Sequence, residues 1–253
     1  MRILVGVKNV IDYAVKIRVN PSKTAVVKDG VPHIINPFCD NALQSCVDLK
    51  ASKTIKEITV LTVGPKSSQT ALRTALAKGA DKAIHVEVDE AGAAKLEPLH
   101  VARALAAIVK RDKYDGVFLG KQAIDDDCNQ VGQLLAGMLN WPQATFANKI
   151  DAKDGGFTVV REIDGGLETI QVKSPAVITA DLRLNTPKYA TLPNIMKAKK
   201  KPLETIKPAD ISLDLVSQTE TLEVNEPPTR KGGEFVADVD ELVAKLKEKG
   251  IFA

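Results

Sequence analysis

Short apolar runs alternate with amphipathic stretches over the first half of the chain. Four runs rich in β-branched residues predict buried strands: 3–7, 57–63, 83–88 and 116–119. Four stretches with apolar residues at helical spacing lie between or after them: 43–50, 72–76, 101–109 and 131–138. Asp40 is the predicted N-cap of the first helix, and Gly79 the predicted end of the second. This alternation predicts a doubly wound α/β fold, with a mainly parallel sheet covered on both faces.

Two segments with hairpin patterns interrupt this core. Residues 17–35 contain three short apolar runs around Asp29-Gly30, a dipeptide typical of tight turns. A second pair of runs, 157–160 and 169–172, is joined across residues 163–167. We therefore expect two hairpins added to the α/β core.

The pattern changes after residue 185. Prolines recur at 187, 193, 202, 208, 227 and 228, and regular periodicity fades. We predict two domains, an α/β core over residues 1–185 and an extended partner-binding arm over residues 186–253. The arm ends in a helix, because Asp238 and Glu241 have the spacing of a capping box and an apolar stripe follows.

The composition is that of a folded protein. Of the 253 residues, 44% are hydrophobic and 26% charged, and the net charge is +3. This value conceals an uneven distribution, since residues 183–207 carry +6 and the rest of the chain −3. Because aromatic residues make up only 4% of the chain, a nucleic-acid surface built on stacking is disfavoured.

Cysteine and hydropathy patterns indicate the compartment. Cys39, Cys46 and Cys128 cannot form a fully paired set of disulfides, and no zinc-site spacing occurs. We therefore predict no metal site and favour a reducing compartment. No apolar run approaches the ~20 residues of a membrane span, and the N-terminus predicts a strand rather than a signal peptide. We expect a soluble, intracellular protein without membrane insertion.

The most unusual local sequence is GKQAIDDDCNQ at residues 120–130, which follows a predicted strand and opens a helix. In a parallel α/β sheet this is the carboxyl edge, where ligands bind. Gly120 permits close backbone approach, Lys121 adds positive charge, and free helix N–H groups favour an anion. The carboxylates of residues 125–127 oppose a phosphate unless they point away or hold a cation. These residues alone leave nucleotide binding and an ordinary helix start, capped by Asp127, equally open.

Two further loops are expected at the same edge. Residues 36–40 open a helix, and Gly64-Pro65 follows a strand. Each alone is typical of turn chemistry, but their convergence favours a binding site. The GxGxxG and GxxxxGK[ST] phosphate motifs are both absent, so a kinase or ATPase of the usual kinds is unsupported. Cys39 and Cys128, near predicted helix starts, are interpreted as small buried residues.

The basic segment contains an apolar group at residues 189–196. Apolar residues beside a lysine run are typical of a docking segment with an acidic-rimmed partner. The alternative is a solvated basic face whose apolar residues pack on the core. Leu192-Pro193 predicts the start of a short exposed helix.

Three long motifs stand out in the chain: GKQAIDDDCNQ at 120–130, REIDGGLET at 161–169 and ADLRLN…YATLPNIMKAKKK at 180–201. Together they resemble the β subunit of electron transfer flavoprotein. VIDYAVKIRV at 10–19 and NPFC at 36–39 extend the match nearly from end to end. The resemblance implies an adenine-nucleotide-binding α/β core and a non-catalytic subunit of an electron carrier.

The resemblance also implies cofactors and partners. An α subunit would form a heterodimer with this chain and hold most of the FAD. Electrons would come from acyl-CoA and related flavin dehydrogenases of fatty acid β-oxidation and pass to electron transfer flavoprotein-quinone oxidoreductase. The implied location is the mitochondrial matrix, or the cytoplasm in a bacterium.

Particular residues match the family's functional positions. Tyr13 matches a tyrosine near the flavin, and Glu162 an acidic residue that helps position the mobile flavin domain. A structural AMP would be held by the following residues: Gly6, Asn36, Pro37, Phe38, Cys39, Val63, Gly120, Lys121, Gln122, Ala123, Ile124, Asp125, Asp126, Asp127, Cys128, Asn129, Gln130 and Val131. Partner docking would use the following: Tyr189, Leu192 as the anchor, Pro193, Ile195, Met196, Lys197 and Lys200.

The residues alone also leave open a function of another class, that of an enzyme. A nucleotide-dependent enzyme could be built on a related adenine-binding α/β fold. It would need a pyrophosphatase signature such as SGGxDS, and the chain has none.

Overall fold

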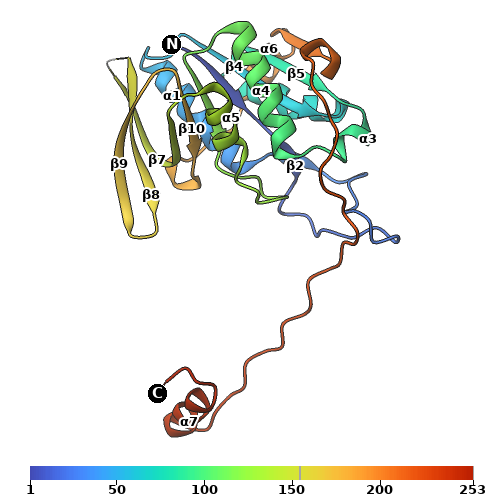
Figure 1. Cartoon of the computed structure of the whole chain (residues 1–253), viewed down its shortest axis with the longest axis vertical. Helices are drawn as coiled ribbons and strands as arrows, with labels where there is room; N and C mark the ends of the chain where they lie inside the picture. Colours follow the sequence, from blue (N-terminus) through green and yellow to red (C-terminus); the bar gives the residue numbers. More distant parts are fainter. Residues whose placement is uncertain (154, 253) are drawn as a thin grey trace. The chain divides into compact units, whose positions relative to one another are not determined.

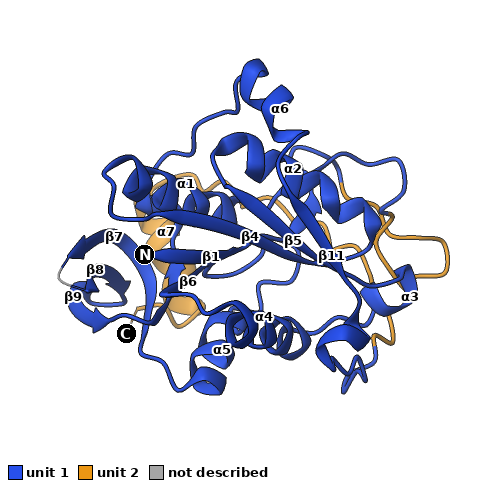
Figure 2. Cartoon of the chain, turned by 90° about the horizontal axis from the view of Figure 1, so that it is seen from above, with its two compact units in different colours: residues 1–16, 28–220 blue, residues 17–27, 221–253 orange. Residues whose placement is uncertain are grey.

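The computed structural model describes residues 1–153 and 155–252. They form two compact units (Figures 1 and 2). Residues 1–16 and 28–220 make the first, and residues 17–27 and 221–253 make the second.

The first unit is built on one large sheet. Its strands occur in the order β11 (Leu203–Ile206), β5 (Lys82–Glu87), β4 (Glu57–Gly64), β1 (Arg2–Gly6), β6 (Gly116–Gly120), β10 (Ala176–Ala180), β7 (Gln143–Lys153), β8 (Gly156–Ile163) and β9 (Gly166–Lys173). Neighbours from β11 to β7 pair in parallel, and β8 and β9 add an antiparallel meander. The predicted doubly wound, mainly parallel sheet is confirmed.

Helices cover both faces of this sheet (Figure 2). α1 (Pro37–Ala51) and α2 (Gln69–Lys78) pack on one face, and α4 (Pro98–Asp112) and α5 (Val131–Leu139) on the other. Alternate strand residues divide between the faces, since Ile3 and Val5 lie in the core under α1 and α2 while Leu4 lies under α4 and α5. The central strands are therefore buried on both sides, which explains their continuous apolar runs.

The remaining elements are short. They are β2 (Asn9–Ile11), β3 (His33–Ile35), α3 (Glu90–Ala93), α6 (Leu192–Ala198), α7 (Val239–Glu248) and the 3₁₀ turns Lys66–Ser68, Leu182–Leu184 and Pro208–Ile211. The described residues contain no helix that is long and apolar enough to span a bilayer.

The first helix begins earlier than predicted. Asn36 occupies the N-cap position and Pro37 the first turn, so the expected N-cap role of Asp40 is wrong. Proline favours the start of a helix because its fixed φ is already helical and its missing N–H would have no partner there. Asp40 instead forms an ion pair with Lys78 of α2.

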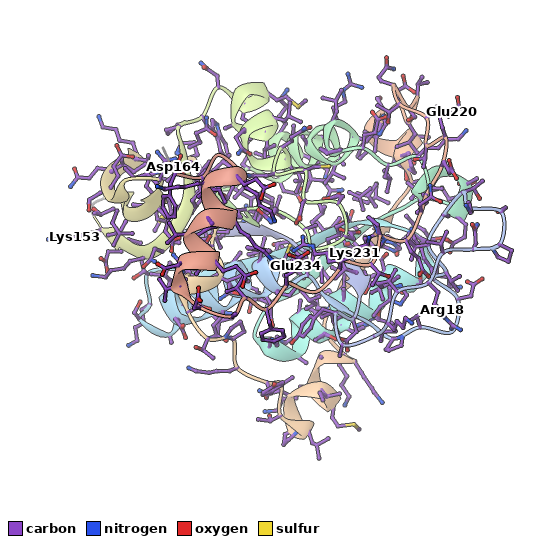
Figure 3. The ribbon with its side chains drawn as sticks, turned by 90° about the horizontal axis from the view of Figure 1, so that it is seen from below. Arg18, Lys153, Asp164, Glu220, Lys231 and Glu234 are labelled. Atoms are coloured by element: carbon purple, nitrogen blue, oxygen red, sulfur yellow. The ribbon has the colours of Figure 1, made fainter. Side chains whose placement is uncertain are left out.

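The two hairpin predictions have different outcomes. The strands β8 and β9 are paired through the turn that contains Asp164, which Figure 3 labels. The predicted hairpin around Asp29-Gly30 is wrong, because His33–Ile35 pairs with Asn9–Ile11 instead. Only an isolated bridge, between Val19 and Val26, joins the other runs.

The compact core continues beyond the predicted boundary at residue 185. β11 pairs with β5 at the edge of the main sheet, and the first unit extends to residue 220. A strand of four residues is too short to show a period, and the preceding Pro202 suggested extended chain. The strands β7 and β10 were also not predicted from the sequence.

The second unit contains the predicted C-terminal helix. Asp238 Oδ1 accepts a hydrogen bond from the Glu241 N–H at 2.9 Å, as expected of an N-cap. Glu241 Oε2 accepts from the Ala237 N–H at 2.7 Å, one residue before the expected partner. Glu234, labelled in Figure 3, lies 3.1 Å from the Lys245 ammonium.

Two glycines on α5 provide a test of the packing against β10. A Cβ at Gly132 would overlap the side chain of Thr179, whereas a Cβ at Gly137 would meet nothing within 4 Å. We expect Gly132→Ala to lower the free energy of unfolding by about 1–3 kcal/mol through overpacking. Gly137→Ala should raise it by about 0.5–1 kcal/mol through helix propensity. Urea unfolding of both variants measures this, and equal effects would contradict the packing described here.

Candidate functional site

The candidate site lies at the carboxyl edge of the parallel strands. The loop after β6 and the first turn of α1 meet there, as the sequence predicted. Gly64 is the last residue of β4 and Pro65 follows it. β4 is separated from β6 by β1. Pro65 lines a different hollow of about 730 Å³ with Glu87 and Lys207, so this third loop lies apart from the other two.

The side chain of Asn36 joins the two loops. Its Nδ2 donates to the Gln122 carbonyl at 2.8 Å, and its Oδ1 accepts from the Ile124 N–H at 3.1 Å. Asn36 is fully buried and makes no side-chain cap to α1, because both ends of its amide are used by the 120–130 loop. Loss of this side chain would leave two partly buried backbone groups without these partners.

Gly120 allows the close approach of these segments. A Cβ at this position would lie 2.7 Å from Phe38 Cβ and 2.8 Å from the Cys39 nitrogen. These neighbours belong to the first turn of α1 and cannot move away as a flexible side chain could. Gly120 is therefore needed for the close approach of the protein's own helix, and its predicted approach to a ligand stays a prediction.

The consecutive carboxylates hold a cation from the protein itself. Lys8 Nζ lies 2.7 Å from Asp125 Oδ1 and 2.7 Å from Asp126 Oδ2. Burial lowers the pKa of Lys8, but its two carboxylate partners outweigh this effect and raise the pKa above its usual value. The ammonium thus offsets part of the negative charge that opposed an anionic ligand.

Asp127 does not cap a helix, so that alternative is wrong. Its Oδ1 accepts from Gln122 Nε2 at 2.9 Å, and its φ of 49° places it in the left-handed region. α5 begins only at Val131, with Gln130 at the N-cap. Residues 121–130 therefore form a loop whose carboxylates bond within the site.

Lys121 is paired with Asp181, a residue that was not predicted from the sequence to belong to the site. Its Nζ lies 2.6 Å from Asp181 Oδ2 and 5.5 Å from the ring centroids of Phe38 and Phe146. Burial raises the pKa of Asp181, but the hydrogen bond from Lys121 and its charge prevail, so the pKa is lowered. Within the described structure the charge of Lys121 is therefore balanced by Asp181.

The two loop cysteines differ in exposure. Cys39 is buried as expected, and burial raises the pKa of its thiol. Cys128 is exposed, so the prediction that it is buried is wrong. Its pKa is also raised, by partial burial and by the nearby Asp126 carboxylate. Neither thiol is activated as a nucleophile.

Unused hydrogen-bonding groups line the same edge. Asn9 Oδ1, just after β1, and Gln133 Oε1, in the first turn of α5, are buried without a partner in the described structure. The N-cap of α5 provides no side-chain hydrogen bond to the free N–H groups of its first turn. The free N–H groups at the start of α5 fit an anion, whereas the two amide oxygens accept hydrogen bonds and fit donors such as hydroxyl or amino groups; a nucleotide carries both kinds of group.

The other predicted site residues differ in their place and exposure. Gly6 and Val63 lie half-buried in β1 and β4, and Ala123 is buried. Tyr13 is largely exposed. Glu162, on β8, accepts a hydrogen bond from Asn148 at 2.8 Å and pairs with Arg183 at 2.7 Å.

The predicted docking segment forms a short exposed helix, α6, beside α2 (Figure 2). Exposed fractions are 79% for Leu192, 62% for Met196 and 41% for Ile195, and Tyr189 just before the helix is 96% exposed. Because these side chains face solvent, the alternative in which they pack on the core is wrong. Pro193, Lys197 and Lys200 are exposed as well.

Sequence reasoning missed several residues that shape these sites. Lys8 follows a predicted strand at the correct edge, and that position was a usable signal. Asp181 follows the short apolar run 176–180, which was not recognised as a strand. Asn41 and Gln44 are buried on α1 and bond to Asn185 and Lys188 of the segment before α6. Their sequence spacing gives no indication of these contacts.

The fold and the loop chemistry together define a doubly wound α/β protein with a polar ligand edge and a separate exposed helix. Residues 23–211 match the family model for the electron transfer flavoprotein domain. The human protein named electron transfer flavoprotein subunit beta is 57% identical over 250 residues, which cover 99% of this chain and 98% of that protein. The relative from Oryza sativa subsp. japonica, named electron transfer flavoprotein subunit beta, mitochondrial, is 53% identical over 98% of both chains. The chain belongs to the family of electron transfer flavoprotein β subunits.

The pair of Lys121 and Asp181 predicts a pH-dependent contribution to stability. Asp181→Asn should lower the free energy of unfolding near pH 7 by about 3 kcal/mol, because it leaves a largely buried ammonium without its counterion. Since the pKa of Asp181 is lowered on folding, this contribution is present above the ordinary carboxyl pKa, about 3.9, and is lost as pH falls through the lower folded value.

Denaturant unfolding between pH 7 and pH 2.5 measures the difference between wild type and variant. The two curves should converge below about pH 4. A difference that is constant over the whole range would contradict this role of the ion pair.

Proposed function

We propose that this chain forms a heterodimer with a flavin-bearing α subunit and serves as its non-catalytic β subunit. The names of its relatives support a partner subunit and a flavin. FAD would be shared with, and mostly held by, the α subunit, with the exposed Tyr13 close to it. When bound, the flavin supplies the electron-transfer chemistry, and this chain supplies binding surfaces. Names of plant relatives support mitochondria, and we propose the matrix, or the cytoplasm in a bacterium.

The loop at residues 120–130 is proposed to hold a structural AMP. The support is the set of unpartnered groups beside it: Asn9 Oδ1, Gln133 Oε1 and the N–H groups that begin α5. Asn36 would hold the loop in the shape required, through its bonds to Gln122 and Ile124. Hydrolysis would need a base that activates water, and the loop carboxylates are engaged by Lys8 and Gln122, so binding without hydrolysis is proposed.

Acid denaturation tests the nucleotide. We expect the protein purified with its partner to release equimolar AMP, detected by liquid chromatography and mass spectrometry. The physical reason is that a ligand filling unpaired buried groups is retained until those groups unfold. A folded, flavin-loaded heterodimer that releases no nucleotide would contradict the assignment.

α6 is proposed to dock the electron donors, acyl-CoA and related flavin dehydrogenases. The observation that carries this proposal is the apolar surface of Leu192, Ile195 and Met196 beside exposed lysines. Such surfaces on soluble proteins are typical of partner sites. Lys197, Lys199 and Lys200 would speed encounter with acidic partners. Electrons would then pass through FAD to electron transfer flavoprotein-quinone oxidoreductase.

Leu192→Ala tests the docking role. If Leu192 is buried in the partner, its loss should cost about 2 kcal/mol, or about thirtyfold in the KM of an acyl-CoA dehydrogenase for this protein. Flavin content and heterodimer assembly should not change. Val216→Ala, at another exposed apolar residue, is the control and should leave KM as in wild type. An unchanged KM in Leu192→Ala would contradict docking through α6.

A further inference from the structure

Two basic side chains connect the C-terminal ends of α2 and α6. Arg73 Nη1, on α2, donates to the carbonyls of Ala198 and Lys201 at 3.0 and 3.1 Å. In the opposite direction, Lys201 Nζ donates to the carbonyls of Leu76 and Ala80 at 2.9 and 2.5 Å. Each cation thus binds carbonyls at the end of the other helix.

This exchange satisfies a general requirement of helix ends. The last carbonyls of a helix have no intrahelical donors, and cations are favourable there because of the helix dipole. Arg73 and Lys201 supply these donors from 121 to 128 residues away in sequence. The bonds therefore hold a distant segment in place as well as capping a helix.

α6 has few other means of attachment. It is seven residues long, and an isolated helix of that length is not stable in water. Ala198, 2% exposed, is its only buried residue, and its apolar side chains face solvent. Before the helix, the Lys188 N–H donates to Gln44 at 2.9 Å and Ala190 packs against the core, so the segment is also held on the N-terminal side of α6.

We propose that Arg73 and Lys201 are positioning residues that fix the orientation of α6 for partner docking. This inference rests on the proposed docking function of α6. A surface that is already ordered loses less conformational entropy on binding and so binds more tightly. Lys201 then acts inside the protein, and the charges offered to a partner are those of Lys197, Lys199 and Lys200.

The variants Arg73→Gln and Lys201→Met remove the donors. Arg103→Gln is the matched control, because Arg103 is exposed on α4, on the other face of the sheet. Lys201→Arg keeps a charged donor and is the conservative variant. All are made in the full chain and purified with the flavin-bearing partner, and flavin content confirms assembly.

The first measurement is hydrogen exchange of the backbone amides of residues 192–201. We expect Arg73→Gln and Lys201→Met to increase the exchange rate about tenfold, since the ends of α6 lose charged hydrogen bonds. Lys201→Arg and Arg103→Gln should exchange as wild type does. Wild-type exchange in Arg73→Gln and Lys201→Met overturns the proposal, whatever the function of α6.

The second measurement is steady-state reduction by an acyl-CoA dehydrogenase. Arg73→Gln and Lys201→Met should each raise KM about tenfold without changing kcat, because the loosened helix must be ordered again on docking. Recovery of KM in Lys201→Arg would support the positioning role. Faster exchange with an unchanged KM overturns it, and Leu192→Ala then shows whether α6 docks partners at all.

Discussion

The buried amide of Asn36 is the interaction on which the ligand edge depends. It fixes the loop after β6 to the first turn of α1 through the Gln122 carbonyl and the Ile124 N–H. Gly120 allows these segments to lie in contact because it has no side chain. With the loop held in this way, Asp125 and Asp126 reach Lys8, and an acidic sequence becomes compatible with an anionic ligand.

A rigid scaffold positions two surfaces with different tasks. The carboxyl edge of the sheet offers unpaired polar groups inside the protein, whereas α6 offers apolar side chains and lysines to solvent. A small apolar anchor with charges around it favours fast association and fast release, which suits the proposed docking of several electron donors.

Much of the fold could be predicted from the sequence, because strands buried on both faces and amphipathic helices leave strong patterns. β11 was not predicted, since its four residues show no clear period, and β10 was not predicted either. The partners of Lys121 and Arg73 could not be predicted for a related reason. Asp181 is brought to Lys121 by the pairing of β10 with β6, and Lys201 to α2 by the return of the chain to the sheet edge. Local spacing carries no information about such contacts.

The most direct test compares the nucleotide content of two variants. Asn36→Ala and Leu192→Ala are each purified with the flavin-bearing partner, and AMP released by acid is quantified against flavin. We expect Asn36→Ala to contain far less AMP than flavin, because its loop is no longer held, and Leu192→Ala to contain equimolar AMP. Equimolar AMP in Asn36→Ala, or loss of AMP in Leu192→Ala, would contradict the separation of an internal nucleotide edge from an external docking helix.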